Sequence, residues 1–353
     1  MEYRVNRRTG DRISVLGVGT SGLPAAGAKE GAATLEMALE QGINYFDLAT
    51  ADSACFPIFG AALAGVRRQV LYQVHFGANY AAGKPYSWTT DLETVKRSVA
   101  WQLEQLRTDY IDLFQFHNPA QLPDPEDPEG AFAAALEMQQ KGYIRHIGIT
   151  NHRLKVAHEA IESGNFETLQ FPFCYLATEK DLELVELCRE HDMGFIAMKG
   201  MAGGLIRDGL TASAWMQTQE GVVPIWGVQR ECELDQFLQC IREGAELTDE
   251  RRERIGQDRK ELRGGFCRGC GYCMPCPAGI EINQCARISL MVRRAPAAEW
   301  LTEEWQQKMH QIENCLHCGQ CMSKCPYGLN TPELLQANYE DYWKVLAESK
   351  KSK

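Results

Sequence analysis

The sequence predicts an α/β fold in which a (β/α)8 TIM barrel is followed by a smaller, cysteine-rich domain. Two observations predict the barrel: eight short apolar, β-rich segments precede residue 240, and helical patterns fall between them. Most of these segments are continuous apolar runs, as is typical of strands buried on both faces of a parallel sheet. A doubly wound open sheet gives the same alternation, but the count of eight favours the closed barrel.

The eight predicted strands are separated by segments long enough for a helix each. They are Ile13–Thr20, Ile43–Thr50, Val70–Gly77, Tyr110–His117, His146–Thr150, Leu169–Tyr175, Gly194–Gly200 and Val223–Gln229. One intervening helix is predicted to stop at Gly42, because glycine is common just after a helix end. Another is predicted to begin with a capping box at Thr90.

Composition limits the kind of protein. The 353 residues are enough for one large domain plus an appendage, and the net charge of −10 argues against binding to nucleic acid. No apolar run is long enough to span a bilayer, and the charged N-terminal residues lack the apolar core of a secretory signal. We therefore expect a cytoplasmic protein without a membrane partner, whose 14 cysteines stay reduced.

The residues from Phe266 onward contain one cysteine pattern twice. The first copy contains Cys267, Cys270, Cys273 and Cys276, and the second contains Cys315, Cys318, Cys321 and Cys325. Each copy ends in Cys-Pro, and the second has the bacterial ferredoxin spacing; the first is one residue shorter before its last cysteine. We predict a barrel over residues 1–244, a charged linker or solvated helix over 245–265, and a mainly α-helical domain over 266–353.

This spacing predicts two [4Fe–4S] clusters, in which the fourth cysteine of each run reaches the other cluster. One cluster is assigned to Cys267, Cys270, Cys273 and Cys325, and the other to Cys315, Cys318, Cys321 and Cys276. Structural zinc is the alternative, but separated C-x2-C pairs would give the third cysteine of each run no ligand role.

Several segments together resemble a known family. "LGVGT", "NYFDLAT", "DLFQFHNP", "GITNH", "LQFPF" and "AMKGMAGG" occur in the order and spacing of the aldo/keto reductases, over about residues 3 to 240. With the cysteine segment, the chain is similar to the subfamily fused to a two-cluster ferredoxin-like domain. The resemblance implies a barrel enzyme, and in the family such enzymes reduce carbonyls with NADPH.

The resemblance also identifies catalytic positions, of which two depart from the family. Asp47 and His117 match the family's Asp and His, whereas Asp52 stands in place of the proton-donating Tyr and His75 in place of the Lys. Ordinary tyrosine-acid reduction is therefore not expected, and we predict acid–base work by these four residues. A divalent metal on the two His and two carboxylates, or an inert remnant with His75 paired to Asp52, are the alternatives.

The family's nicotinamide contacts are retained in part. Thr150, Asn151 and Gln170 match the residues that hold the carboxamide, while Lys199 and the small residues after it could accept a pyrophosphate. Arg230 is the residue available to a 2′-phosphate. NADP(H) is therefore a candidate cofactor.

The predicted function is an oxidoreductase that acts on a small organic substrate at the barrel mouth. Electrons would pass between that substrate, the two clusters, and either NADPH or a protein donor such as ferredoxin, flavodoxin or another flavoprotein. Tyr80, Tyr86 and Trp88 follow the third strand and could contact the substrate. The alternatives are a non-redox lyase, dehydratase or epimerase that uses the same His and Asp residues, and a non-catalytic electron-carrying subunit.

Overall fold

The structure is a computed structural model that describes residues 1–80, 86–243, 246–262, 265–294 and 296–351. It divides into two compact units: residues 1–200 with 213–247, and residues 201–212 with 248–353. The predicted boundary at 244–245 lies outside the described residues. Among the described residues, no helix combines the length and the apolar character needed to cross a bilayer.

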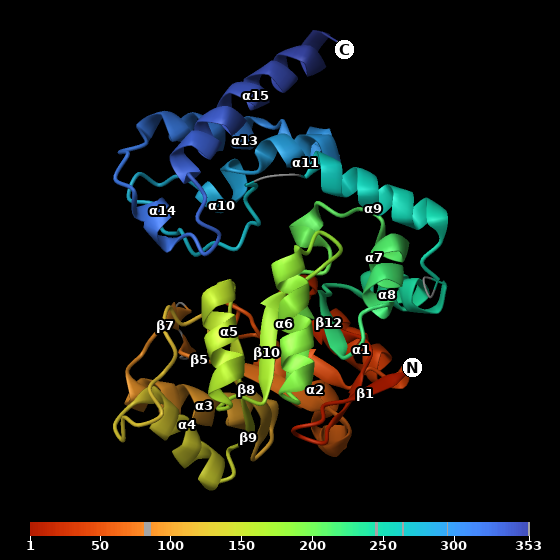
Figure 1. The fold of residues 1–353 in the computed structure, drawn as a ribbon, viewed down its shortest axis with the longest axis vertical. Helices are drawn as coiled ribbons and strands as arrows, with labels where there is room; N and C mark the ends of the chain where they lie inside the picture. The colour runs from red at the N-terminus through yellow and green to blue at the C-terminus, as the bar shows by residue number, and fades with distance from the viewer. Residues whose placement is uncertain (81–85, 244–245, 263–264, 295, 352–353) are drawn as a thin grey trace. The chain divides into compact units, whose positions relative to one another are not determined.

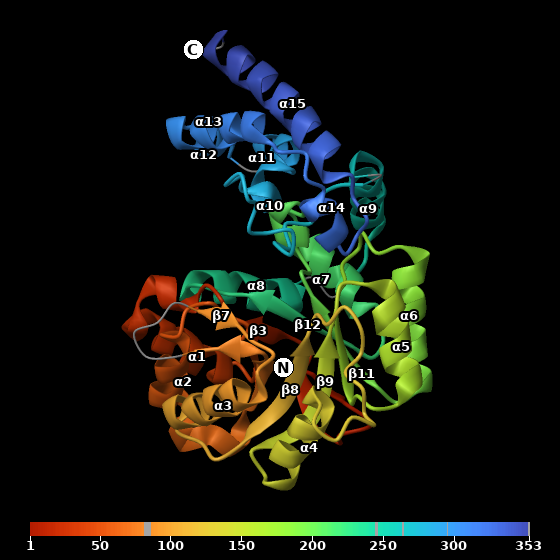
Figure 2. The same cartoon turned by 90° about the vertical axis from the view of Figure 1, so that its left-hand side faces the viewer.

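The first unit contains the predicted closed barrel of eight parallel strands, which lie in the order β10–β11–β12–β3–β4–β5–β8–β9 around the ring. The strands are β3 (Gly17–Gly19), β4 (Tyr45–Asp47), β5 (Leu71–Phe76), β8 (Ile111–His117), β9 (Ile144–Thr150), β10 (Thr168–Pro172), β11 (Gly194–Met198) and β12 (Val222–Gly227). Because all are parallel, their carboxyl ends meet at one rim, where barrel enzymes carry their active sites. Helices lie outside the ring of strands (Figure 1, Figure 2).

The first predicted strand is wrong in one respect, because it breaks into two pieces. Its first part belongs to β2 (Arg12–Ser14), which pairs antiparallel with β1 (Tyr3–Val5). Only β3 joins the barrel. A second hairpin, β6 (Ala78–Asn79) with β7 (Ser87–Trp88), follows the third barrel strand.

The helices of this unit alternate with the strands as predicted. They are α1 (Ala28–Glu40), α2 (Cys55–Leu63), α3 (Leu92–Leu106), α4 (Ala131–Gln140), α5 (Leu154–Ser163), α6 (Glu179–Glu190), α7 (Gly209–Gln217) and α8 (Glu231–Glu243), with 3-10 turns η1 (Leu23–Ala26) and η2 (Ala64–Gln69). Helix α1 ends just before Gly42, which has a φ of 85°. Helix α3 is capped by Asp91, whose side chain accepts from Thr94 N, and not by Thr90.

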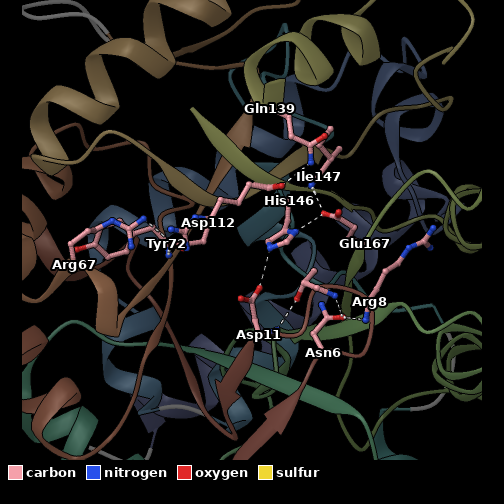
Figure 3. A network of polar contacts seen from close by, with 12 residues as sticks. Asn6, Arg8, Asp11, Arg67, Tyr72, Asp112, Gln139, His146, Ile147 and Glu167 are labelled. Carbon is pink, nitrogen blue, oxygen red and sulfur yellow. Dashed lines mark hydrogen bonds and ion pairs between the residues drawn. The ribbon is translucent and has the colours of Figure 1, made fainter. Parts of the chain in front are cut away.

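A network of polar contacts, of which the Arg67–Asp112 pair is buried, surrounds the amino ends of β8, β9 and β10 (Figure 3). Arg67 Nη2 lies 2.6 Å from Asp112 Oδ2, and both side chains are buried. His146 lies between two carboxylates, 3.4 Å from Asp11 and 3.1 Å from Glu167. These contacts tie the loop of the N-terminal hairpin and the turn after α2 to the barrel strands.

The second unit is mainly helical, as predicted. Its helices are α9 (Asp249–Glu261), α10 (Ile282–Cys285), α11 (Ile288–Arg294), α12 (Ala297–Trp300), α13 (Glu303–His310), α14 (Gln320–Lys324) and α15 (Thr331–Lys351), with 3-10 turns η3 (Ala202–Gly204) and η4 (Gln311–Asn314). They pack around an apolar core that includes Ile280, Ile288, Met309, Leu335 and Tyr342.

Helix α9 was expected to be a solvated linker helix, and the structure corrects this. Ile255 and Asp258 are buried. The buried guanidinium of Arg294 donates to Asp258 at 2.9 Å and to Glu261 at 2.5 Å. The charged helix therefore has one face fixed by ion pairs within the second unit.

Candidate functional site

Three of the predicted catalytic residues form a hydrogen-bonded chain at the carboxyl rim of the barrel. Asp47 ends β4, His117 ends β8, and His75 is the residue before the last of β5, which lies between those two strands. His75 Nε2 is 2.8 Å from Asp47 Oδ1, and His75 Nδ1 is 3.1 Å from His117 Nδ1. Asp47 and His75 are buried, whereas His117 is half-buried.

The surroundings fix the charge of the two ends of this chain. Burial alone would raise the pKa of Asp47, but the charge and hydrogen bond of His75, with the amides of Gln73 and Gln170, hold that pKa below its ordinary value. Burial and the charge of His75 lower the pKa of His117 to about 3. At neutral pH Asp47 is therefore a carboxylate and His117 a neutral imidazole.

The contact between the two imidazoles requires one proton between their Nδ1 atoms. With His75 Nε2 donating to Asp47, that proton is bound either to His75, which is then an imidazolium, or to His117. In the first arrangement His117 has its own proton on Nε2. When it releases that proton and takes the shared proton from His75 at Nδ1, the second arrangement results, with one proton fewer. The three residues can thus deliver a proton at the half-buried end of the chain.

Asp52 does not take part in this chain. It is exposed, and its Oδ1 accepts from Ala54 N at the start of α2. The predicted alternative of a His75–Asp52 pair is wrong, because His75 is hydrogen-bonded to Asp47 and His117. Among the described residues, no three His, Cys, Asp or Glu side chains converge on the position of a single metal ion.

A ladder of glutamines, which the sequence analysis missed in part, continues from Asp47 down the barrel axis. Gln170 Nε2 donates to Asp47 Oδ2 at 3.1 Å, and Gln170 Oε1 accepts from Gln73 Nε2. Gln73 Oε1 in turn accepts from Gln115 Nε2 at 2.9 Å and from the Tyr45 hydroxyl. This ladder orients the carboxylate, since one of its oxygens faces an amide and the other faces His75.

The foot of the ladder depends on a glycine. Gln115 Nε2 also donates to Thr168 Oγ1, at 3.0 Å. A Cβ on Gly148 would lie 2.1 Å from that oxygen and 2.6 Å from Gln115 Oε1. Only a residue without a side chain fits between them. Alternation along β5 and β8 could have revealed the ladder, because Gln73 and Gln115 stand two residues before the inward-facing histidines.

Aromatic residues of the β6–β7 hairpin lie beside the mouth. The Trp88 ring lies 4.3 Å from that of His117, measured between centroids, and Trp88 is 47% exposed. Tyr80 is instead buried, and its hydroxyl donates to Thr50 O at 2.5 Å. Burial raises the pKa of Tyr80 far above its ordinary value, so this phenol is not a proton donor for the mouth.

The residues predicted to hold the nicotinamide carboxamide are engaged within the protein. Both ends of the Gln170 amide belong to the ladder. Asn151 donates to Pro119 O and accepts from the backbone of His152 and Arg153 at the start of α5. Thr150 is buried. These residues therefore offer no ready carboxamide site, and NADP(H) stays a prediction.

The predicted phosphate-binding residues lie in different surroundings. Lys199 follows β11 with a φ of 60°, and its charge acts on His117. The segment after it belongs to the second unit, where Arg287 donates to Gly203 O and Arg294 to Leu205 O. Those carbonyls are therefore turned towards arginines of the second unit. Arg230 is exposed at the start of α8.

The cysteines of the second unit fall into two groups. One hollow is lined by Cys276 with Cys315, Cys318 and Cys321 of the second run, and also by Cys273. Burial, together with the neighbouring thiols of Cys267, Cys270 and Cys325, raises the pKa of Cys273 to about 12. These neighbours agree with the crossed assignment of three cysteines of one run and the last cysteine of the other to each cluster, which stays a prediction.

The arrangement of the thiols fits iron–sulfur clusters better than zinc. A single zinc ion draws four ligands to one point, whereas the irons of a [4Fe–4S] cluster each take one thiolate at a separate corner. The hollow lined by Cys276 and three cysteines of the second run has the donor set that a cluster requires.

A pH dependence of stability follows from the histidine environments. Because folding lowers the pKa of His117 from about 6.5 to about 3, the unfolded chain binds more protons in that interval. Its contribution to the free energy of unfolding therefore falls as pH falls from about 6.5. We expect His117→Gln to lose less stability than the parent between pH 7 and pH 5, measured by thermal unfolding midpoints.

His146 provides the control with the opposite sign. Burial lowers its pKa, but the hydrogen bond and charge of Glu167, together with Asp11, outweigh burial and leave the pKa raised. Its stabilising contribution is present at low pH and is lost as pH rises through that pKa. His146→Gln should therefore lose more stability than the parent on acidification, and equal slopes in all three proteins would contradict both assignments.

Comparisons with known proteins agree with this architecture. Residues 15–250 match the aldo/keto reductase family, and residues 266–330 match a 4Fe-4S dicluster domain. The oxidoreductase YqkF of Bacillus subtilis is 29% identical over 201 residues, which cover 56% of this chain and 63% of YqkF. The aldo-keto reductase YhdN of the same organism is 27% identical over 221 residues, which cover 60% of this chain and 65% of YhdN. The match thus spans less than two thirds of each relative.

A solved structure shows the same fold. The holo form of the aldo-keto reductase AKR11C1 from Bacillus halodurans superposes with a TM-score of 0.61 at 24% identity, covering 73% of this chain and 96% of the other. The family resemblance and the fold class predicted from the sequence are both confirmed. The chain belongs to the aldo/keto reductase family, and a 4Fe-4S dicluster domain follows the part that matches the family.

Proposed function

We propose that this protein is an oxidoreductase that reduces a small carbonyl compound at the barrel mouth, with the Asp47–His75–His117 chain as the proton source. The observation that carries the proposal is this hydrogen-bonded chain, in which His75 stands at the position of the family's Lys and links Asp47 to His117. His117 Nε2 gives a proton to the substrate oxygen, His75 Nδ1 refills His117, and the Asp47 carboxylate holds His75 in position. Trp88, whose ring lies beside that of His117 at a tilt of 35°, covers one side of the substrate.

We assign the clusters, as the cysteine groups suggest, to Cys267, Cys270, Cys273 and Cys325 and to Cys315, Cys318, Cys321 and Cys276. When bound, the clusters supply one-electron transfer at a potential set by their surroundings. A carbonyl needs two electrons and two protons to become an alcohol. If the electrons come from an external protein such as ferredoxin or a flavoprotein, the chain gives one proton and water the other. If NADPH is the donor, its hydride replaces the electrons and that second proton.

Anaerobic holoprotein tests this directly. We expect reduced ferredoxin or NADPH to generate the EPR signal of reduced clusters, and a small carbonyl such as methylglyoxal to remove that signal. His117→Gln should slow the carbonyl-dependent step by about a hundredfold or more, the usual contribution of a general acid, and leave reduction by the donor unchanged. His191→Gln, an exposed histidine after α6, is the matched control.

Two outcomes would refute the proposal. One is a pair of results: the clusters of the holoprotein do not respond to the donors, and carbonyl turnover continues at full rate after the clusters are removed. The other is an unchanged rate of the carbonyl-dependent step in His117→Gln.

A further inference from the structure

A cavity of the barrel unit lies at the end opposite the proposed catalytic mouth. It has a volume of about 400 Å3 and reaches Thr168 and Gly194, the first residues of β10 and β11. The N-terminal hairpin and the end of α6 complete its wall. Cavities of this volume are large enough for a small organic ligand.

Arg4 is the unusual residue of this cavity. It stands on β1 opposite Ile13, and its Nη1 is buried with no hydrogen-bond partner among the described residues. Burial lowers the pKa of Arg4, against the charges of Glu2 and Glu220, yet a guanidinium stays protonated at any ordinary pH. Arg4 as a whole is half-buried, but a buried N–H group of a guanidinium without an acceptor is unfavourable unless a ligand supplies one.

The other charged groups of the cavity already have partners. Arg7 pairs with Asp192 at 3.6 Å, and Arg189 pairs with Glu220 at 3.9 Å. Among the residues that line the cavity, three guanidinium groups face two carboxylates, and the charges of Glu2, outside the lining, and of Glu220 also act on Arg4 without a hydrogen bond to its Nη1. A ligand with a single negative charge would supply the missing acceptor.

The rest of the wall is largely apolar. Its apolar members include Ile13, Val185, Met193, Phe195 and Val223. A ligand that fills this space therefore needs a hydrocarbon body as well as its charged group. Inorganic phosphate lacks that body, and its second charge would exceed the charge available.

We propose that this cavity binds a small organic monocarboxylate, with the carboxylate on the Arg4 guanidinium and the hydrocarbon part against the strand ends. Arginine suits this role because its planar fork matches the geometry of a carboxylate. The site is separate from the proposed catalytic mouth, and its existence does not depend on the reaction proposed there.

Calorimetric titration of the holoprotein with hexanoate tests the site. We expect hexanoate to bind with one-to-one stoichiometry, and its uncharged analogue hexanamide to bind at least tenfold more weakly. Arg4→Met should weaken hexanoate binding at least tenfold, since a hydrogen bond to a charged group contributes roughly 1.5–3 kcal/mol. Arg12→Met is the matched control, because Arg12 lies on the same hairpin and does not line the cavity.

Thermal unfolding distinguishes a binding residue from a structural one. Without ligand, Arg4→Met should raise the unfolding midpoint, because the variant no longer buries an N–H group without an acceptor. Hexanoate should raise the midpoint of the parent and leave that of Arg4→Met unchanged. Glu220→Gln, at a side chain that is 83% exposed, should tighten hexanoate binding by removing a competing negative charge.

Several results would overturn the proposal. They are equal binding of hexanoate and hexanamide, no binding of millimolar hexanoate, and unchanged hexanoate binding in Arg4→Met. A lower midpoint of Arg4→Met without ligand would assign Arg4 a structural role, and Arg4-dependent binding of inorganic phosphate without binding of hexanoate would replace the ligand class.

Discussion

A protein that carries both Cys276→Ser and Cys318→Ser is expected to retain as much iron as either single variant. On the crossed assignment these two cysteines bind the same cluster, as their places around one hollow suggest. Once that cluster is lost, removing a second of its ligands costs nothing more. Each of the three proteins should therefore contain about half of the parent's iron and labile sulfide, as counted by chemical analysis under anaerobic conditions.

The matched variant Cys273→Ser with Cys276→Ser should lose nearly all iron. These cysteines are neighbours in the sequence, but Cys273 lies among the thiols of Cys267, Cys270 and Cys325. If each run instead bound its own cluster, the two double variants would exchange their results. The comparison is internal, because both doubles share Cys276→Ser and carry the same number of substitutions.

Arg67→Met is expected to cost about 3–5 kcal/mol in the free energy of unfolding, the usual cost of removing one partner of a buried ion pair. Arg67 donates to Asp112 at 2.6 Å and to the carbonyls of Val70 and Tyr110. The substitution would leave the Asp112 carboxylate buried with fewer partners. Chemical denaturation followed by circular dichroism measures the loss.

Two further variants separate the charge effect from packing. Arg67→Met with Asp112→Leu should recover much of the stability, because no charge is then left buried without its partner. Arg145→Met should cost below about 1 kcal/mol, since Arg145 is 51% exposed although it also contacts Asp112. A loss in Arg67→Met no larger than that in Arg145→Met would refute the buried-pair interpretation.

The pH response of Arg67→Met offers a second test. Burial raises the pKa of Asp112, and Arg67 opposes that rise in the parent. Without Arg67 the pKa rises further, so the folded variant takes up a proton at a higher pH than the unfolded chain does. The stability deficit of Arg67→Met should therefore shrink as pH falls, because protonation removes the buried charge.

Much of the architecture follows from the sequence alone, for a physical reason. Strands that are buried on both faces are continuous apolar runs, and the eight predicted runs correspond to the eight barrel strands. The ends were less certain: Ile13–Thr20 divides into β2 and β3, and α3 is capped by Asp91 one residue after the predicted Thr90. Both Thr and Asp are good N-cap residues, so the local sequence does not show which of Thr90 and Asp91 begins the helix.

The site was predictable where a residue ends a strand, and not where it lies in a loop. Asp47, His75 and His117 stand at or near the carboxyl ends of adjacent strands, so their meeting follows from the barrel topology. Asp52 lies five residues beyond its strand, and the course of that loop turns it to the solvent. The pairing of His75 with Asp47 also depends on strand order, which no local pattern contains.

Buried charges were the least predictable features. Arg4, Arg67 and Arg294 look like ordinary surface arginines in the sequence, and each is wholly or partly buried in the structure. Their partners, where they have them, come from distant segments, as Asp112 does for Arg67 and Asp258 for Arg294. The charge composition of the sequence does not show which residues, distant in the chain, form these ion pairs.

The glutamine ladder does not conduct protons along the barrel axis. Its amides neither gain nor lose protons at ordinary pH, and burial raises the pKa of Tyr45, its one titratable member besides Asp47, well above the ordinary value. On the proposed mechanism, a proton that His117 and His75 give up therefore returns from the rim and not along the glutamine ladder. A bound substrate that closes the rim to water could then receive one proton from the two histidines and no second one.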